Sequence, residues 1–212
     1  MQILEEISAA LQQGKLKVVT ELVTKALGDG TSAKEILEGG LLAGMSIIGE
    51  KFKKNEVYVP EVLIAARAMN AGAALLKSAL ADEGVESGGT VVLGTVKGDL
   101  HDIGKNLVKM MMEGKGLKVV DMGVDVPAEK FIETAKSEKA QIIACSALLT
   151  TTMSEMKNVV EAANTAGIRN ELKIMIGGAP ITNEFCKSIG ADLYAPDAAS
   201  AADEAVVVCK GA

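Results

Sequence analysis

One short segment of this chain combines residue types that could do chemistry. It runs from Gly98 to Asn106, reads GDLHDIGKN, and holds the chain's single histidine, His101, two residues after Asp99. A carboxylate beside an imidazole can hold one ring nitrogen and leave the other free to bind a metal. The pair therefore predicts a ligating histidine. The alternative is a surface histidine in a chance hydrogen bond.

The glycines and the lysine of the same segment also suggest a phosphate-binding loop. A P-loop needs four residues between its glycines and a Ser or Thr directly after its lysine. Here five residues separate Gly98 from Gly104, and Asn106 follows Lys105. The dinucleotide fingerprint G-x-G-x-x-G is absent as well. Neither phosphate-binding motif fits the segment.

The composition limits the class of protein. The 212 residues are 49% hydrophobic, with three Phe, two Tyr and no Trp, which predicts an aliphatic core in one large or two small domains. The net charge of −6 argues against a nucleic-acid-binding surface. Cys145, Cys186 and Cys209 are scattered and odd in number, which is typical of a reducing compartment and indicates neither a disulfide framework nor a zinc cluster.

The sequence also bears on membrane association. We find no apolar run long enough to span a bilayer, and the first residues lack the basic start of a signal peptide. We therefore expect a cytoplasmic protein that binds neither a membrane nor nucleic acid.

Residues 1–86 have helical apolar spacing. Ser32 and Glu35 form a predicted capping box, and Pro60 suits the first turn of a helix. The pattern predicts a small four-helix bundle, followed by a polar, glycine-containing linker at Asp82–Gly89. The four stripes run through Ile3, Ile7 and Leu11; Val18, Val19, Leu22, Val23, Ala26 and Leu27; Leu37, Leu41, Met45, Ile48 and Phe52; and Val62, Ala66, Met69, Ala73, Leu76 and Leu80.

Residues 87–212 have a different period. Short apolar runs alternate with helical segments, and Thr152 with Glu155 resembles another capping box. Strict alternation predicts an α/β Rossmann-like (flavodoxin-like) domain with a parallel five-stranded sheet, whose ligands bind beyond the carboxyl ends of the strands. The expected strands are Thr90–Val96, Leu117–Val120, Gln141–Cys145, Leu172–Ile176 and Leu193–Ala195. The helices are expected to begin near Ile103, Pro127, Thr152, Thr182 and Ala198.

Three motifs at the predicted strand ends match a known pattern. Asp99-x-His101-x-x-Gly104, then Ser146-x-Leu148, then Gly177-Gly178 resembles the signature of cobalamin-binding proteins in which a protein histidine displaces the cofactor's own benzimidazole base. The resemblance implies a base-off/His-on cobalamin or related corrinoid with His101 as the axial cobalt ligand. The glycines would leave room for the nucleotide tail. The implied cofactor-binding residues are Asp99, His101, Asp102, Ile103, Gly104, Gly94, Thr95, Ser146, Leu148, Thr150, Gly177, Gly178, Phe52 and Val59.

The resemblance extends upstream. Residues Gly44–Phe52 and Val57–Val62 are similar to the cap module of methionine synthase and of methyltransferase corrinoid proteins. In that family the cap covers the upper face of the corrin, so Phe52 and Val59 would shield it. Ordinary bundle core is the alternative for both residues. A cap in that position has to swing aside about the linker before partners can reach the corrin.

The function implied by the resemblance is that of a corrinoid methyl carrier. Cobalt(I) would accept a methyl group from a substrate-specific methyltransferase, and methyl-cobalt(III) would donate it to a second methyltransferase with a tetrahydrofolate or thiol acceptor. A reductive activase is the third implied partner, and the chain is not expected to turn over alone. A small subunit of an adenosylcobalamin-dependent mutase and a B12-binding sensor stay open as alternatives. A receiver domain would leave the Ser-x-Leu and Gly-Gly motifs to coincidence.

Overall fold

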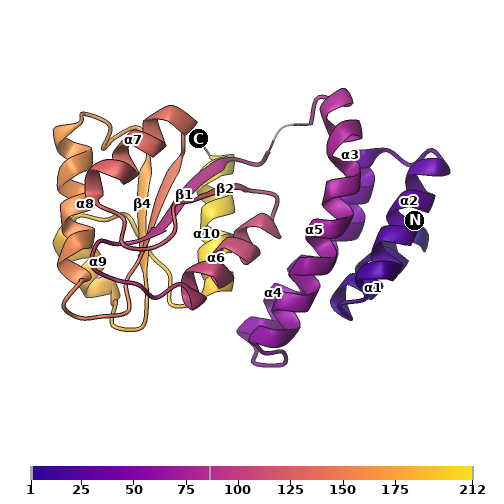
Figure 1. The fold of residues 1–212 in the computed structure, drawn as a ribbon, viewed down its shortest axis with the longest axis horizontal. Coiled ribbons are helices and arrows are strands. Elements are labelled where there is room, and N and C mark those ends of the chain that lie inside the picture. Colours follow the sequence, from indigo (N-terminus) through magenta and orange to yellow (C-terminus); the bar gives the residue numbers. More distant parts are fainter. Residues whose placement is uncertain (1, 86, 212) are drawn as a thin grey trace. The chain divides into compact units, whose positions relative to one another are not determined.

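The computed structural model describes residues 2–85 and 87–211, which form two compact units (Figure 1). One unit is Met1–Ser87 together with Gly114–Gly116, and the other is Gly88–Glu113 together with Leu117–Ala212. The first is helical and the second is α/β, as the change of apolar period predicts.

The helical unit contains four helical segments. They are α1 (Gln2–Gln12), α2 (Leu16–Gly28), the continuous run of α3 (Ala33–Glu35), η1 (Ile36–Leu42) and α4 (Ala43–Lys53), and α5 (Val59–Asp82). The capping box at the start of α3 is confirmed: the Ser32 hydroxyl accepts from Glu35 N, and the Glu35 carboxylate accepts from Ser32 N. Pro60 lies in the first turn of α5, as expected.

The third segment departs from the predicted stripe because η1 is a π-helix. A π-turn closes from residue i to i+5, so the buried position five residues before Leu41 is Ile36, which is fully buried. Leu37, which the regular helical period predicts, is only half-buried. Gly40 lies in the same turn, where an added Cβ would stand 3.0 Å from Ile7. The π-helix η1 thus lies where α1 packs closely against this segment.

Contrary to the expectation from the sequence, the 24-residue helix α5 has the length and composition of a membrane span: an 18-residue window within it has a mean hydropathy of 1.3, and no other helix of the described chain meets that test. The core helix of a bundle has the same properties, and α5 packs mainly against α2. Its predicted inner face is buried at Val62, Ala66, Met69 and Leu76, and half-buried at Ala73 and Leu80. This face accounts for its apolar character.

The α/β unit is built on five parallel strands in the order β2-β1-β3-β4-β5. Helices α6 and α10 lie on one face of the sheet, and α7, α8 and α9 lie on the other (Figure 1). The strands are β1 (Thr90–Thr95), β2 (Lys118–Asp121), β3 (Ile142–Ser146), β4 (Lys173–Gly177) and β5 (Leu193–Tyr194). The helices are α6 (Ile103–Glu113), α7 (Ala128–Glu138), α8 (Met153–Thr165), α9 (Asn183–Ile189) and α10 (Ala198–Lys210).

The strand order reverses at β1, which lies between β2 and β3. In open parallel sheets the crevice at such a switch point, beyond the carboxyl ends of the strands, is where ligands bind. Thr95 and Ser146 pair in register as the last residues of β1 and β3. The loops that follow these two strands, which carry His101 and Leu148, therefore leave the sheet side by side.

Candidate functional site

The centre of the site is Asp99, whose side chain is fully buried. Its Oδ2 accepts hydrogen bonds from Leu148 N at 2.8 Å, Leu149 N at 3.2 Å and the Thr152 hydroxyl at 2.8 Å. Its Oδ1 faces His101. Burial by itself raises the pKa of a carboxyl, but the hydrogen bonds from Leu148, His101 and Thr152 outweigh it and hold the pKa of Asp99 well below its usual range. Asp99 is therefore an ionised carboxylate that ties the loop after β1 to the loop after β3.

The ionised Asp99 determines the state of His101. Ring atom Nδ1 lies 2.7 Å from Asp99 Oδ1, and the main-chain N of His101 donates to the same oxygen at 3.1 Å. An ionised carboxylate only accepts, so Nδ1 carries the proton and a neutral ring keeps its lone pair on Nε2. The side chain is 49% exposed. Nε2 is therefore the ring nitrogen left for a metal, as the Asp-x-His spacing predicts.

Further contacts fix the main chain of this loop. The Thr95 hydroxyl donates to His101 O at 2.8 Å. Asp125, in the loop after β2, accepts from Gly98 N at 2.7 Å through Oδ1 and donates its own N–H to Asp99 O at 3.0 Å. Asp125 has a φ of 55°, a left-handed conformation that is uncommon outside glycine and is found at functional loops. The end of β1 and the loops after β2 and β3 thus all contribute to holding His101 in place.

Thr152 corrects one sequence prediction. The Thr-x-x-Glu pattern predicts a capping box, but the Thr152 side chain makes no capping hydrogen bond. Its hydroxyl donates to Asp99 Oδ2 instead, within reach also of Leu149 O at 3.0 Å. Thr150, which the resemblance placed at the cofactor, is exposed and contributes nothing to this network. The hydroxyl on Asp99 thus comes from Thr152, two residues further along.

The surface around His101 is open and apolar. A Cβ added at Gly104 would meet no atom within 4 Å. Leu100 is 71% exposed and Ile103 is 77% exposed, on the two sides of His101 in the sequence. Exposed apolar residues gathered beside a potential metal ligand are typical of a surface that a bound group covers.

Gly94 packs against a side chain of the protein. A Cβ at Gly94 would lie 2.8 Å from the ring of Phe131, which is fully buried on α7. The ring of Phe131 explains why a glycine lies here, and contact of Gly94 with a nucleotide tail stays a prediction.

The remaining glycines lie against the main chain. Gly178 has a φ of 136°, and a Cβ there would overlap the carbonyl of Ala147. At Gly177 a Cβ would stand 3.2 Å from Ala195 O. Glycine is thus required so that the loops after β3, β4 and β5 can approach one another.

The other predicted residues lie at the same edge of the sheet and differ in exposure and in their hydrogen bonds. Leu148 is 43% exposed while its N–H is bound to Asp99. Ser146 is half-buried, and its carbonyl accepts from Val96 N at 3.0 Å. Asp102 is exposed and accepts from the Asn106 side chain at 3.1 Å. Ser146 and Leu148 thus lie beside Asp99, whereas Asp102 secures the first turn of α6.

An ion pair between the buried Lys105 and the partly exposed Asp121, which the sequence did not predict, secures the same turn. Lys105 is 2% exposed, and its Nζ donates to Asp121 Oδ1 at 2.5 Å and to Asn106 Oδ1 at 2.8 Å. Burial by itself raises the pKa of Asp121, but the hydrogen bonds from Lys105 and Gly123 lower it overall. The pair binds α6 to the end of β2. From the sequence, Lys105 is considered only as part of a P-loop motif, and no local pattern predicts its pairing with Asp121.

Phe52 and Val59 belong to the helical unit. Phe52 lies in the last turn of α4 and Val59 is the first residue of α5, and both are half-buried. Within that unit they are neither core residues, as Met45 and Ile48 are at 1% exposure, nor fully exposed.

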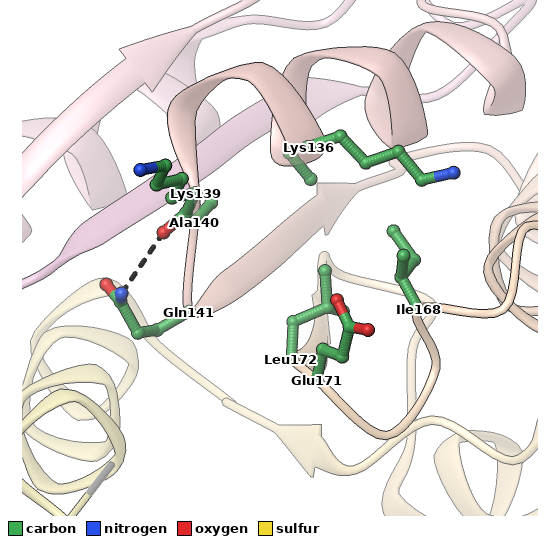
Figure 2. Close-up of a pocket in the computed structure, with 8 residues that line it drawn as sticks. Lys136, Lys139, Ala140, Gln141, Ile168, Glu171 and Leu172 are labelled. Carbon is green, nitrogen blue, oxygen red and sulfur yellow. Dashed lines mark hydrogen bonds between the residues drawn. The ribbon is translucent and has the colours of Figure 1, made fainter.

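A cavity of about 270 Å³ at the opposite, amino-terminal edge of the sheet is a weaker candidate (Figure 2). Its polar groups already bind neighbouring loops: Gln141 accepts from Thr90 N at 2.7 Å and donates to Lys139 O at 3.1 Å, and Lys136 donates to Ala166 O at 3.2 Å. Ligands of parallel sheets bind at the other edge. The cavity is therefore a gap between secondary elements.

Comparisons with known proteins agree with this geometry. Residues 89–206 match a family model described as a B12 binding domain, and residues 3–77 match a second model with the same description. Trimethylamine corrinoid protein 1 of Methanosarcina acetivorans is 45% identical over 184 residues, which cover 86% of this chain and 85% of that protein. The dimethylamine corrinoid protein of Methanosarcina barkeri is 43% identical over 206 residues, 96% of each chain.

Solved structures are similar over the whole chain. The methanol:cobalamin methyltransferase complex MtaBC of Methanosarcina barkeri aligns with a TM-score of 0.89 at 29% identity, covering all of this chain and 81% of that one. A cobalamin-binding protein of Desulfitobacterium hafniense aligns with a TM-score of 0.78 at 31% identity, covering 95% and 96%. The chain belongs to the family of corrinoid proteins that carry a B12-binding domain behind a helical cap.

Proposed function

We propose that this chain is a corrinoid methyl carrier in which His101 is the lower axial ligand of a base-off corrinoid. When bound, the corrinoid supplies a cobalt centre that accepts and gives up a methyl group. The protein supplies the ligand, its orientation and protection from solvent. The observation that carries the proposal is the Nδ1 contact of His101 with the buried, ionised Asp99, because it leaves Nε2 free on an open surface.

The residues present fit a corrinoid. Gly104 faces open space, and the apolar side chains of Leu100 and Ile103 are available to cover a large ring. No cluster of three or more His, Cys, Asp or Glu side chains that could hold a bare ion is found in the described part of the chain. A single histidine with a fixed tautomer suits a metal whose remaining ligands come with its own macrocycle.

The helical unit supports a carrier over the alternatives. Residues 3–77 match a B12-binding model of their own, and the whole chain aligns with corrinoid proteins. A mutase subunit would leave this unit without a role. We assign Phe52 and Val59 to shielding the corrin, because both keep part of their apolar surface outside the bundle core.

Partner proteins complete the reaction. The relatives are named for trimethylamine and dimethylamine, and one similar chain was solved in a methyltransferase complex. We assign this chain a substrate-specific methyltransferase as methyl source, a second methyltransferase as recipient, and a reductive activase, all in the cytoplasm. The methyl donor is then selected by the partner.

The test is ligand replacement. The apoprotein is loaded with cobinamide, a corrinoid that lacks the benzimidazole base, reduced to cobalt(II), and examined by electron paramagnetic resonance for the nitrogen coupling of an axial imidazole, which the cofactor itself then cannot supply. Wild type should show the coupling, and His101→Ala should lack it. Free imidazole, which fits the space left by the half-exposed ring, should restore it.

Methyl transfer is tested separately. The loaded wild-type protein, chemically reduced to cobalt(I), should be methylated by a methylamine or methanol methyltransferase that is given its substrate, and His101→Ala should be methylated more slowly. Wild type without nitrogen coupling would contradict the ligation. Loaded wild type that no methyltransferase of these classes methylates would contradict the carrier role.

A further inference from the structure

Thr95 lies at the end of β1 with none of its surface exposed. The resemblance places it among the cofactor-binding residues, yet its hydroxyl donates to the main-chain carbonyl of His101 at 2.8 Å. A hydroxyl buried at the end of an apolar strand is unfavourable unless it is hydrogen-bonded. The carbonyl of His101 is the partner that makes a hydroxyl favourable here.

Thr95 itself cannot shift easily. Its N–H donates to Gly123 O at 3.0 Å and its carbonyl accepts from Val126 N at 3.0 Å. On the other side it pairs with Ser146 of β3. The residue is thus held by its neighbours on both sides, and its hydroxyl is a donor at a fixed position.

The hold on His101 by Thr95 complements the one by Asp99. The main-chain N and the ring Nδ1 of His101 both point to the same Asp99 oxygen, which sets the direction of the ring. The carbonyl of His101 is held by Thr95 alone among the described residues. Without that bond, the main chain at His101 could turn, which would loosen the contacts of its N–H and its ring with Asp99.

We propose that Thr95 is a positioning residue for the cobalt ligand: it holds the main chain of His101 so that Nε2 is presented at one fixed place. The inference rests on the proposed function, in which His101 binds cobalt. Thr95 acts through the His101 carbonyl and does not touch the corrinoid.

The test compares Thr95→Val, which keeps the shape and removes the hydroxyl, with Thr95→Ser, which keeps the hydroxyl. The readout is the ratio of His-ligated to unligated cobalt(II) in the loaded protein, from the nitrogen coupling. One lost hydrogen bond should lower this ratio about 2- to 10-fold in Thr95→Val, and Thr95→Ser should stay within about twofold of wild type. In the apoprotein, exchange of the His101 amide hydrogen should accelerate by a similar factor in Thr95→Val only.

Each outcome decides between the possibilities. A folded Thr95→Val with the wild-type ratio and wild-type exchange overturns the inference, and so does a Thr95→Ser that is as impaired as Thr95→Val. If Thr95→Val does not fold, Thr95→Ala is read in the same way. In wild type, the Thr95 hydroxyl proton must exchange slowly with water, and fast exchange also overturns the inference. If wild type and His101→Ala have the same spectrum, the ligation proposal fails instead, and amide exchange still decides the role of Thr95.

Discussion

The two units of this protein present their candidate residues in opposite ways. In the α/β unit, Asp99 is polar, fully buried and hydrogen-bonded by three groups of a distant loop. In the helical unit, Phe52 and Val59 are apolar, half-buried and next to ordinary core positions. A buried carboxylate is unfavourable without partners and so calls for an explanation, whereas a half-buried Phe on a bundle helix does not. A polar site can therefore be recognised from burial and hydrogen bonds, whereas an apolar shield has the same burial as ordinary helix-bundle residues.

The largest effect should distinguish Asp99, which holds the two loops together, from His101, which is the proposed metal ligand. Asp99→Ala leaves Leu148 N, Leu149 N and the Thr152 hydroxyl without their acceptor, so the free energy of unfolding of the apoprotein should fall by about 3–5 kcal/mol. His101→Ala removes a half-exposed side chain and should change it by less than about 1 kcal/mol. Urea denaturation measures both. Equal losses of unfolding free energy in the two variants would contradict the role of Asp99 as the hub, the residue that ties the loop after β1 to the loop after β3.

The helical unit should show the converse separation. Ile48→Ala empties a position that is 1% exposed and should destabilise the unit by about 2–4 kcal/mol. Phe52→Ala should cost less, because part of its ring is already outside the core. Phe52→Ala alone should speed the oxidation of the reduced corrinoid by air, measured by absorbance. If the two variants oxidised at equal rates, Phe52 would be a core residue and no shield.

Acid should act on the polar hub. The pKa of Asp99 lies below its value of about 3.9 in an unfolded chain, so its contribution to stability is full above that value and is lost as the pH falls toward the folded-state pKa. The urea midpoint of wild type should therefore drop more steeply below about pH 4 than that of Asp99→Asn. Parallel slopes would mean that Asp99 is not held ionised by its neighbours.

The smallest effect should have opposite signs in the free and loaded protein. Gly104 is in the first turn of α6 and faces open space, so Gly104→Ala should stabilise the apoprotein by up to about 1 kcal/mol through helix propensity. The added methyl group should weaken corrinoid binding, measured by fluorescence quenching or equilibrium dialysis. Unchanged affinity would place the corrinoid away from Gly104.

Local patterns predicted most of the fold. The strands, the helices after them and the four helical segments follow from apolar periods a few residues long, and Asp99 with His101 is a local pair. What the sequence left open depends on distant partners. Thr152 satisfies a local capping pattern, yet its hydroxyl is taken by Asp99, 53 residues away. Gly94 is expected to leave room for a nucleotide tail, and no local pattern predicts the ring of Phe131 that packs against it.

The hub contacts of Asp99 also bear on the order in which the protein forms. Its partners in the second loop lie 49 to 53 residues along the chain, on the far side of β2 and α7. Contacts of such long sequence separation carry a loop-closure cost and form late in folding, after β1 and β3 have paired. A newly made chain therefore acquires a correctly held His101 only once the loops after β1 and β3 have met.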